Sequence, residues 1–167
     1  MRTGTAVEEI IVTWTDYDSG TCSIARTAQI LGDRWTVLVV RDLFNGVRRF
    51  DALQDHLGIA RDVLTRRLAL LVAEGLVERR PIRLEGERAR HEYVLSAAGR
   101  DLRTVLVAIL DWGDAHRSGP DGPPAALRHD GCGEAVHARL VCDAGHEIDA
   151  DARARLVPLD GARLRSA

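Results

Sequence analysis

The chain has 167 residues, of which 46% are hydrophobic, so it is long enough for one domain with a true core and a small accessory part. No apolar run approaches the roughly 20 residues that cross a bilayer, and residues 1–20, with Glu8 and Glu9, lack a signal-peptide layout. Three cysteines are too few for a disulfide framework. We therefore expect a cytoplasmic protein with no membrane partner.

The net charge of -2 is spread unevenly along the chain. Residues 26–95 hold 13 arginines against ten acidic residues, whereas the rest of the chain is acidic. Every basic residue is arginine and none is lysine, which suits bidentate contact with phosphate and guanine, although a composition bias explains most of it. The positive charge is thus concentrated in one segment.

Residues 1–20 form an N-terminal segment whose apolar run, Ala6 to Trp14, fits an edge strand or a short helix. Apolar spacing predicts a helix over residues 22–31, with Thr21 as its cap and Cys22 in its first turn. A second helix begins after Asp33 and ends near residue 45. We interpret both as support helices for the segment that follows.

Residues 49–95 predict a helix-turn-helix followed by a hairpin. Two short helical patterns meet at Leu57 and Gly58, and the second buries apolar residues at helical spacing through Val72. Strand-like runs at 77–84 and 90–95 then flank a turn at 85–87. This order indicates a mainly α fold with a small β part (α+β), a winged helix-turn-helix in which the second helix enters a major groove of DNA.

Four polar residues, Arg61, Asp62, Thr65 and Arg66, remain outside on the second helix, near its start. In an isolated helix we would interpret them as an ordinary solvated face, but the neighbouring hairpin carries five arginines, namely Arg79, Arg80, Arg83, Arg88 and Arg90. We predict that double-stranded DNA is the partner, with base contacts from Arg61, Thr65 and Arg66 and with phosphate or minor-groove contacts from Arg83, Arg88 and Arg90.

A long helix is predicted from Ser96, its N-cap, to about His116. Its apolar residues spread wider than one packed side requires, because Val107 and Ala108 lie outside the main stripe. Complete burial inside a larger core is the alternative for such a helix. A chain of this size favours a homodimer interface instead.

The remaining chain divides into a linker at 118–124, rich in glycine and proline, and a small β-rich extension at 125–167; residues 21–117 form the DNA-binding and dimerisation domain. His129, Cys132, Cys142 and His146 form two short pairs that match a tetrahedral zinc site. A ribbon of this kind would usually have a second C-x2-C motif, but Gly145 occupies the position of its last cysteine. The alternatives are His137 as a ligand, a metal-free remnant, or a disulfide between the two cysteines.

At this point the chain resembles the HxlR-type winged helix-turn-helix regulators of bacteria. The matching residues, in order, are Cys22, residues 30–35, 43–46, 49–51, 64–68, 74–77, 92–93 and 95–99. The resemblance implies a homodimer that binds a palindromic operator through its winged domain and associates through its N-terminal and post-wing helices. Asp33-Arg34 before the tryptophan, Ala60 before the recognition helix and Glu85-Gly86-Glu87-Arg88 in the wing depart from the family pattern.

Similar proteins include members that respond to oxidants or electrophiles at a cysteine matching Cys22. Helix N-termini stabilise a thiolate, and Arg26 lies one turn further on. The alternative is a small buried residue at a dimer contact. The resemblance thus adds a redox role for Cys22, or a small-molecule or oxidant effector, to the expected DNA-binding function.

Two other functions compete with DNA-dependent regulation. An enzyme is disfavoured because no nucleophile triad, phosphate loop or paired-carboxylate site stands out. A protein-binding adaptor with a winged fold would normally present aromatic or aliphatic anchors where this chain has arginines. We therefore predict a non-enzymatic, sequence-specific transcriptional regulator.

Overall fold

A computed structural model describes residues 13–82 and 90–165. The chain divides into two compact units, one made of Met1–Gln29 with Arg155–Ala167 and the other of Ile30–Ala154. Among the helices of the described ranges, none has the length and apolar character needed to cross a membrane.

The first unit joins the beginning and the end of the chain. Two short 3-10 helices, η1 (Trp14–Asp16) and η2 (Ser19–Thr21), precede α1 (Ser23–Leu31). Tyr17 pairs with Leu164, and the Asp18 N–H donates to the carbonyl oxygen of Arg163 at 2.7 Å. The C-terminal residues therefore hydrogen-bond to the segment before α1.

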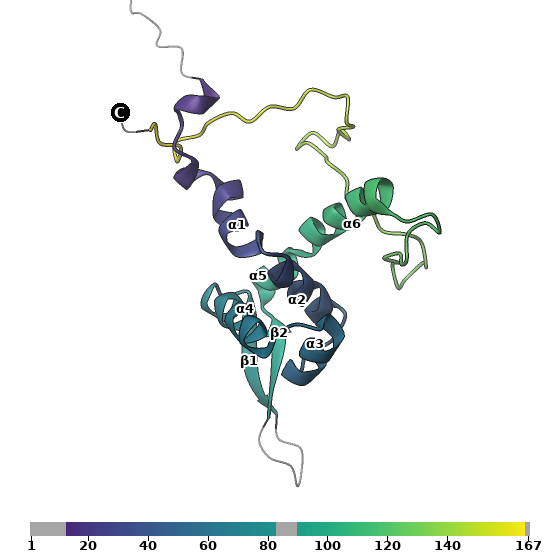
Figure 1. Ribbon diagram of the computed structural model, residues 1–167. Coiled ribbons are helices and arrows are strands. Elements are labelled where there is room, and N and C mark those ends of the chain that lie inside the picture. Colours follow the sequence, from purple (N-terminus) through teal and green to yellow (C-terminus); the bar gives the residue numbers. More distant parts are fainter. Residues whose placement is uncertain (1–12, 83–89, 166–167) are drawn as a thin grey trace, which may run out of the picture. The chain divides into compact units, whose positions relative to one another are not determined.

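The second unit contains the predicted winged helix-turn-helix (Figure 1). Helices α2 (Arg34–Phe44), α3 (Phe50–Leu57) and α4 (Arg61–Ala73) are followed by strands β1 (Val77–Ile82) and β2 (Arg90–Leu95). The strands are antiparallel, with Val77 opposite Leu95 and Ile82 opposite Arg90. The mainly α fold with a small β part is therefore confirmed.

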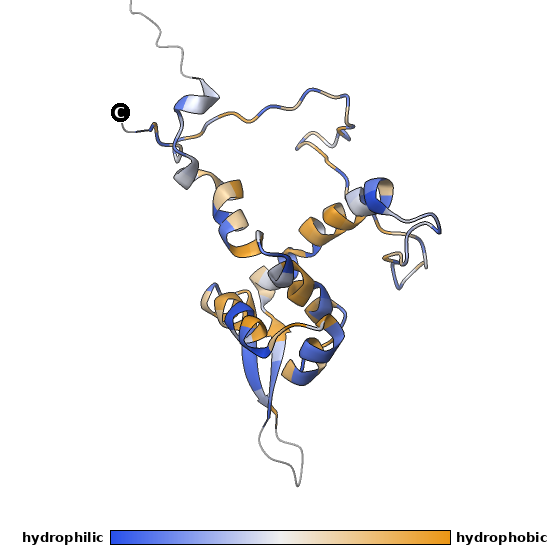
Figure 2. Cartoon of the chain, viewed as in Figure 1, coloured by the Kyte–Doolittle hydropathy of each residue, from blue (hydrophilic) through white to orange (hydrophobic). Residues whose placement is uncertain are grey.

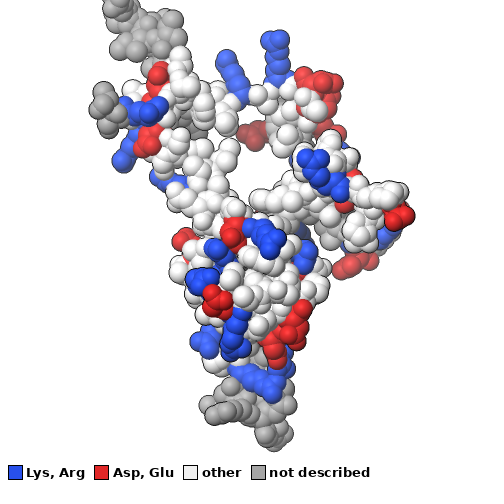
Figure 3. All heavy atoms as spheres, viewed as in Figure 1, with Lys and Arg blue, Asp and Glu red and all other residues white. Residues whose placement is uncertain are grey.

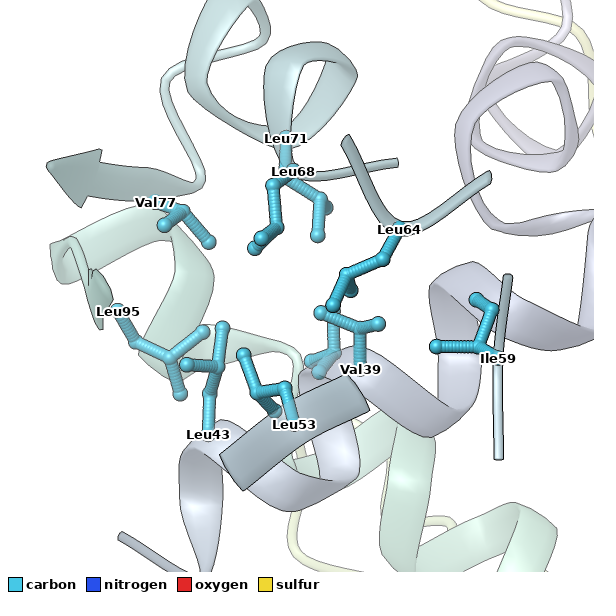
Figure 4. Close-up of a cluster of buried hydrophobic side chains, with 10 residues drawn as sticks. Val39, Leu43, Leu53, Ile59, Leu64, Leu68, Leu71, Val77 and Leu95 are labelled. Atoms are coloured by element: carbon cyan, nitrogen blue, oxygen red, sulfur yellow. The ribbon is translucent and has the colours of Figure 1, made fainter. Parts of the chain in front are cut away.

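The core of this unit lies between α2, α4 and the base of the hairpin (Figure 4). Leu64, Leu68 and Leu71 of α4 are at most 2% exposed, and their spacing places all three on one side of the helix. They meet buried side chains from every neighbouring element: Val39, Val40, Leu43, Leu53, Ile59, Val77 and Leu95. Helices α2, α3 and α4 thus each contribute apolar residues to this core, and Figure 2 shows both hydrophobic and hydrophilic residues along these helices.

Asp33, the N-cap of α2, and Asp42 within α2 connect this helix to the other helices. Asp33 caps α2 by accepting from the backbone N–H of Trp35 at 2.9 Å, and its other carboxylate oxygen lies 3.0 Å from the Arg67 guanidinium of α4. Asp42 is 1% exposed and accepts from Arg41 and from His56 of α3, the latter at 2.7 Å. A buried carboxylate needs such partners, because burial without them is costly. These contacts orient α3 and α4 against α2.

The long helix predicted after Ser96 is two helices, α5 (Ala97–Asp101) and α6 (Arg103–Arg117), which meet at Leu102. The chain tightens there, since the Leu102 N–H donates to the carbonyl of Gly99, three residues back. Ser96 holds the start of α5: its hydroxyl accepts from the Gly99 N–H and donates to the carbonyl of Gly75 at 2.6 Å. The predicted N-cap is confirmed, whereas the uninterrupted helix is not observed.

After α6 the described chain is made of turns and isolated bridges. Arg128 pairs with Ala135, and Val141 pairs with Glu147. Among the described residues of 118–165, these bridges occupy the place of the strands that we expected in a β-rich extension. Leu140, Val141 and Leu156 are 54–69% exposed, so the alternating apolar residues have no sheet partner to cover them.

Gly99 has a role that only a residue without a side chain can fill. A Cβ at this position would collide with the carbonyl oxygen of Leu76. Gly99→Ala should therefore lower the free energy of unfolding by about 1–3 kcal/mol, the usual cost of overpacking. Chemical denaturation followed by circular dichroism measures the change.

Gly113→Ala is the matched control, because a Cβ there meets nothing within 4 Å and the residue lies inside α6. Alanine favours a helix over glycine by roughly 1 kcal/mol. The control should leave stability unchanged or raise it. Equal destabilisation by both variants would contradict the close approach of α5 to Leu76.

Candidate nucleic-acid interface

Arg61, Asp62, Thr65 and Arg66 are all exposed near the start of α4, whereas Leu64, Leu68 and Leu71 are buried, and we call these four exposed residues the recognition face. The side chains of Arg66 and Asp62 are 64% and 67% exposed. Burial of the apolar side of α4 sets the orientation of this helix about its own axis. These polar groups therefore stay in contact with solvent. The structure therefore brings the predicted residues of α4 together.

Contacts within the recognition face orient its side chains. Arg66 donates to the Asp62 carboxylate at 2.8 Å, one turn apart. The Thr65 hydroxyl donates to the carbonyl of Arg61 at 2.8 Å, and the Arg61 guanidinium lies 4.9 Å from the centre of the Phe50 ring. An arginine stacked on an aromatic ring loses less freedom when it binds a ligand than a free one does.

The turn before α4 leaves the start of this helix open. Gly58 adopts a left-handed conformation with φ of 59°, and Ala60 occupies the N-cap position without a side-chain hydrogen bond. The first N–H groups of α4 are therefore not satisfied by a cap. Such N–H groups, together with the helix dipole, favour an anion such as a phosphate.

A groove of about 840 Å³ lies between α4 and the hairpin, and we call it the arginine groove. It is lined by these residues: Arg49, Phe50, Asp51, Arg61, Thr65, Leu68, Ala69, Val72, Ala73, Arg79, Arg90, His91 and Tyr93. Its arginines come from three separate parts of the chain. Figure 3 shows arginine side chains over the winged part of the visible face, with acidic side chains between them.

Arg49 and Arg79 were not among the predicted contact residues. Arg79 could have been found from the strand alternation, because it lies two residues after buried Val77 and therefore on the same side of β1. No local sequence pattern predicts the position of Arg49, because the direction in which the chain enters α3 depends on contacts with residues far away in the sequence. In the fold, Arg49 pairs with Asp51 at 3.1 Å, and Arg79 lies 3.1 Å from His91.

The Arg49 guanidinium beside Asp51 lowers the pKa of that carboxyl below its usual value, and a backbone hydrogen bond from Ala52 adds to the effect. Asp51 therefore stays charged and fixes Arg49 at the mouth of the arginine groove. Arg90 is exposed at the start of β2. Arg83 and Arg88 lie outside the described residues, so their predicted contacts stay predictions.

Cys22 lies at the start of α1, one position before the first turn in which we placed it. Its carbonyl accepts from the Arg26 N–H at 3.0 Å, which makes Cys22 the N-cap residue, and its side chain is half-buried. Thr21 donates its hydroxyl to Asp18 instead of capping α1. The Arg26 side chain donates to the carbonyl of Gly20. The redox role of Cys22 stays a prediction.

The histidines and cysteines of the extension form two separate pairs. The His129 Nδ1 and Cys132 Sγ atoms are 3.3 Å apart, and the Cys142 Sγ and His146 Nδ1 atoms are 3.6 Å apart. Backbone N–H groups of His146 and Ala144 bond to the Cys142 sulfur and lower the pKa of that thiol. Within the described ranges, no three such residues form one group that could hold a metal ion.

His137 contacts α6 and neither of these pairs. Its Nδ1 atom lies 2.9 Å from Asp111, whose second carboxylate oxygen accepts from the Ala138 N–H at 2.7 Å. These bonds lower the pKa of Asp111, with the contribution from His137 the larger. Residues 137–138 therefore attach the extension to α6.

The fold and its arginine-lined face define a winged helix-turn-helix transcriptional regulator. The family model for HxlR-like helix-turn-helix proteins matches residues 30–120, more than half of the chain. The chain therefore belongs to the HxlR-like family, and the resemblance found in its sequence is confirmed. Members are transcriptional regulators and not enzymes, in agreement with the sequence prediction.

Known proteins share this architecture over most of the chain. An uncharacterized HTH-type transcriptional regulator of Mycobacterium bovis is 46% identical over 129 residues, which cover 77% of this chain and 80% of the relative. The crystal structure of PA1607, a candidate transcription factor, has a TM-score of 0.72 at 32% identity and covers 81% of this chain and 94% of its own.

A third similar structure is that of the redox regulator HypR in its reduced form. Its TM-score is 0.51 at 25% identity, and the match covers 57% of this chain and 93% of that protein. The likeness to HypR is thus limited to little more than half of the chain. The Mycobacterium bovis relative and PA1607 extend the match beyond that part.

Proposed function

We propose that the protein is a homodimeric regulator that binds a palindromic DNA operator, with the recognition face of α4 in the major groove. The observation that carries this proposal is the position of Arg61, Thr65 and Arg66 on one exposed side of α4, beside the arginine groove. Helix and groove together supply what a winged domain needs, namely side chains for base edges and cations for the phosphates next to them.

Arg66 is suited to contact a guanine with two hydrogen bonds. Its partner Asp62 is equally exposed, and such solvent-exposed ion pairs contribute roughly 0–1 kcal/mol, so exchanging the carboxylate for a base costs little. Arg49, Arg79 and Arg90 surround the groove and face phosphates, while Arg83 and Arg88 are proposed to extend these contacts along the hairpin.

Arg66→Ala should weaken binding to the operator by about 1–3 kcal/mol and relax the base preference at one position of each half-site. Arg79→Ala should lower affinity for operator and random DNA alike, with a salt dependence smaller by about one counterion. Fluorescence anisotropy at several salt concentrations measures both, on the fragment that the protein protects in a footprint upstream of its own coding region.

Arg153→Ala is the control, because it removes the same charge from an exposed position outside the winged part. It should change neither affinity nor the salt dependence. Unchanged operator affinity in Arg66→Ala would contradict the assignment of the recognition face. Weak, salt-independent binding by the unmodified protein would favour the protein-binding adaptor.

Helix α6 supports the homodimer. Val107 is the only buried residue of α6, while Val105, Ile109 and Trp112 are 41%, 50% and 55% exposed. A shallow, wholly apolar hollow beside it is lined by Leu31, Val37, Val40, Leu102, Val105, Leu106 and Ile109. Exposed apolar side chains along one helix, here Val105, Ile109 and Trp112, mark an association site. A second copy suits it, since a two-fold axis pairs the same helix from both chains and places two recognition helices about one turn of DNA apart.

Ile109→Asp should convert the dimer to a monomer, because it places an unpaired carboxylate in the proposed apolar interface. Operator affinity should fall with it, since one half-site is then bound alone. Sedimentation velocity at several concentrations gives the mass. Leu159→Asp, at a residue that is 80% exposed outside α6, is the control and should stay dimeric. A dimeric Ile109→Asp protein would refute an interface on α6.

We also propose that an oxidant or a small molecule controls DNA binding, with Cys22 as the thiol that responds to oxidants. The support is the half-buried position of Cys22 at the start of α1 and the likeness to a redox regulator. Helix N-termini favour reactive cysteines. Because Ile24 of α1 is 67% exposed, a chemical change at Cys22, the N-cap of α1, would act beside exposed apolar surface of this helix.

Cys22 becomes the sole thiol when Cys132 and Cys142 are both replaced by serine. In that variant, iodoacetamide at neutral pH should alkylate Cys22 several-fold faster than it alkylates N-acetylcysteine. Mild oxidation should also reduce operator affinity in this variant but leave a fully cysteine-free variant unaffected. Alkylation no faster than that of the free thiol would end the proposal of a sensing cysteine.

A further inference from the structure

The C-terminal extension contains two similar turns, each of which holds one imidazole and one thiol. In the first, the Gly133 N–H donates to the carbonyl of His129 at 2.7 Å, and Arg128 pairs with Ala135 around it. In the second, the Gly145 N–H donates to the carbonyl of Cys142 at 2.8 Å, and Val141 pairs with Glu147. Both turns are therefore fixed by backbone hydrogen bonds.

The spacing within each pair is that of two ligands on one metal ion. A tetrahedral zinc ion with usual bond lengths to sulfur and nitrogen separates these two atoms by about 3.6 Å. The observed separations are 3.3 Å for His129 and Cys132 and 3.6 Å for Cys142 and His146. Each turn thus presents one edge of a tetrahedron, with the Nδ1 atom of its histidine on the side of the sulfur.

The extension has no apolar core to stabilise it. Among the described residues from 118 to 165, no side chain is buried, and Leu140 is 69% exposed. Segments of this size usually depend on a metal, a disulfide or a partner. Two closed turns that each end in metal-binding groups favour the metal.

The connection between the two turns is short. The Val136 N–H bonds to Leu127 and the Ile148 N–H bonds to Leu140, so only residues 137–139 lie between the two hairpins. His137 and Ala138 are attached to Asp111 of α6, which keeps this connection in place. No three of the four side chains lie together in the described residues, so a shared site requires the two hairpins to turn toward each other about residues 137–139.

We propose that His129, Cys132, Cys142 and His146 bind one structural zinc ion, and that binding draws the two hairpins into a single closed site. Both thiols give up their protons to solvent, and both histidines bind as neutral imidazoles. Four protein ligands fill the tetrahedral shell, so the site leaves no position for a substrate. The zinc serves to fold the extension against α6.

The test is elemental analysis of full-length protein that was purified without a chelator or a metal-affinity tag. We expect about one zinc ion per chain. Cys142→Ser and His129→Ala should each lose most of it. Cys22→Ser should keep it, because Cys22 is not in the extension, and so should His137→Ala, because His137 bonds to Asp111. Circular dichroism should show the same helix content in all variants, which separates loss of metal from loss of fold.

Cobalt gives an independent readout of the shell. Replacement of zinc by Co²⁺ should produce the visible absorption of tetrahedral cobalt and a near-ultraviolet thiolate band, and Cys132→Ser should weaken that band. A protein that binds no zinc even after it is supplied would overturn the proposal. Zinc retained by Cys142→Ser, zinc lost from His137→Ala, or a Cys132 to Cys142 disulfide found by thiol titration would overturn it equally.

Discussion

The burial of Leu64, Leu68 and Leu71 is the constraint on which the winged part depends. These side chains fill the space between α2 and β1 and are at most 2% exposed, so α4 has only one rotation about its own axis that keeps them from water. Moving three leucines into solvent would cost several kcal/mol, at about 2 kcal/mol each. The ion pair between Asp33 and Arg67 also favours this orientation of α4. The direction of the recognition face is therefore a consequence of the core.

Most of the winged domain could be predicted because its signals are local. The period of the leucines indicated α4, Gly58 indicated the turn, and the alternation after Val77 indicated the hairpin. The outward position of Arg61, Thr65 and Arg66 followed from the same period. Such patterns depend on residues a few positions apart, and a single sequence contains them in full.

The features that escaped prediction join residues far apart in the chain. The arginine groove needs the distance between α4 and β1, and the close approach of Gly99 to Leu76 joins α5 to the residue before β1. In the extension, apolar alternation suggested strands, but alternation produces a sheet only where a neighbouring strand completes the hydrogen bonds.

In the proposed complex with DNA, the carboxylate of Asp62 beside the arginines of the recognition face would affect how the protein searches a genome. A phosphate placed against this face would meet a negative charge 2.8 Å from Arg66, so contact with DNA would be disfavoured wherever α4 does not meet the correct bases. Weaker attraction to DNA of any sequence would shorten the time that the protein spends at each nonspecific site. A chain with an overall charge of -2 would thereby move readily along DNA and remain longest where Arg66 finds an acceptor better than its own aspartate.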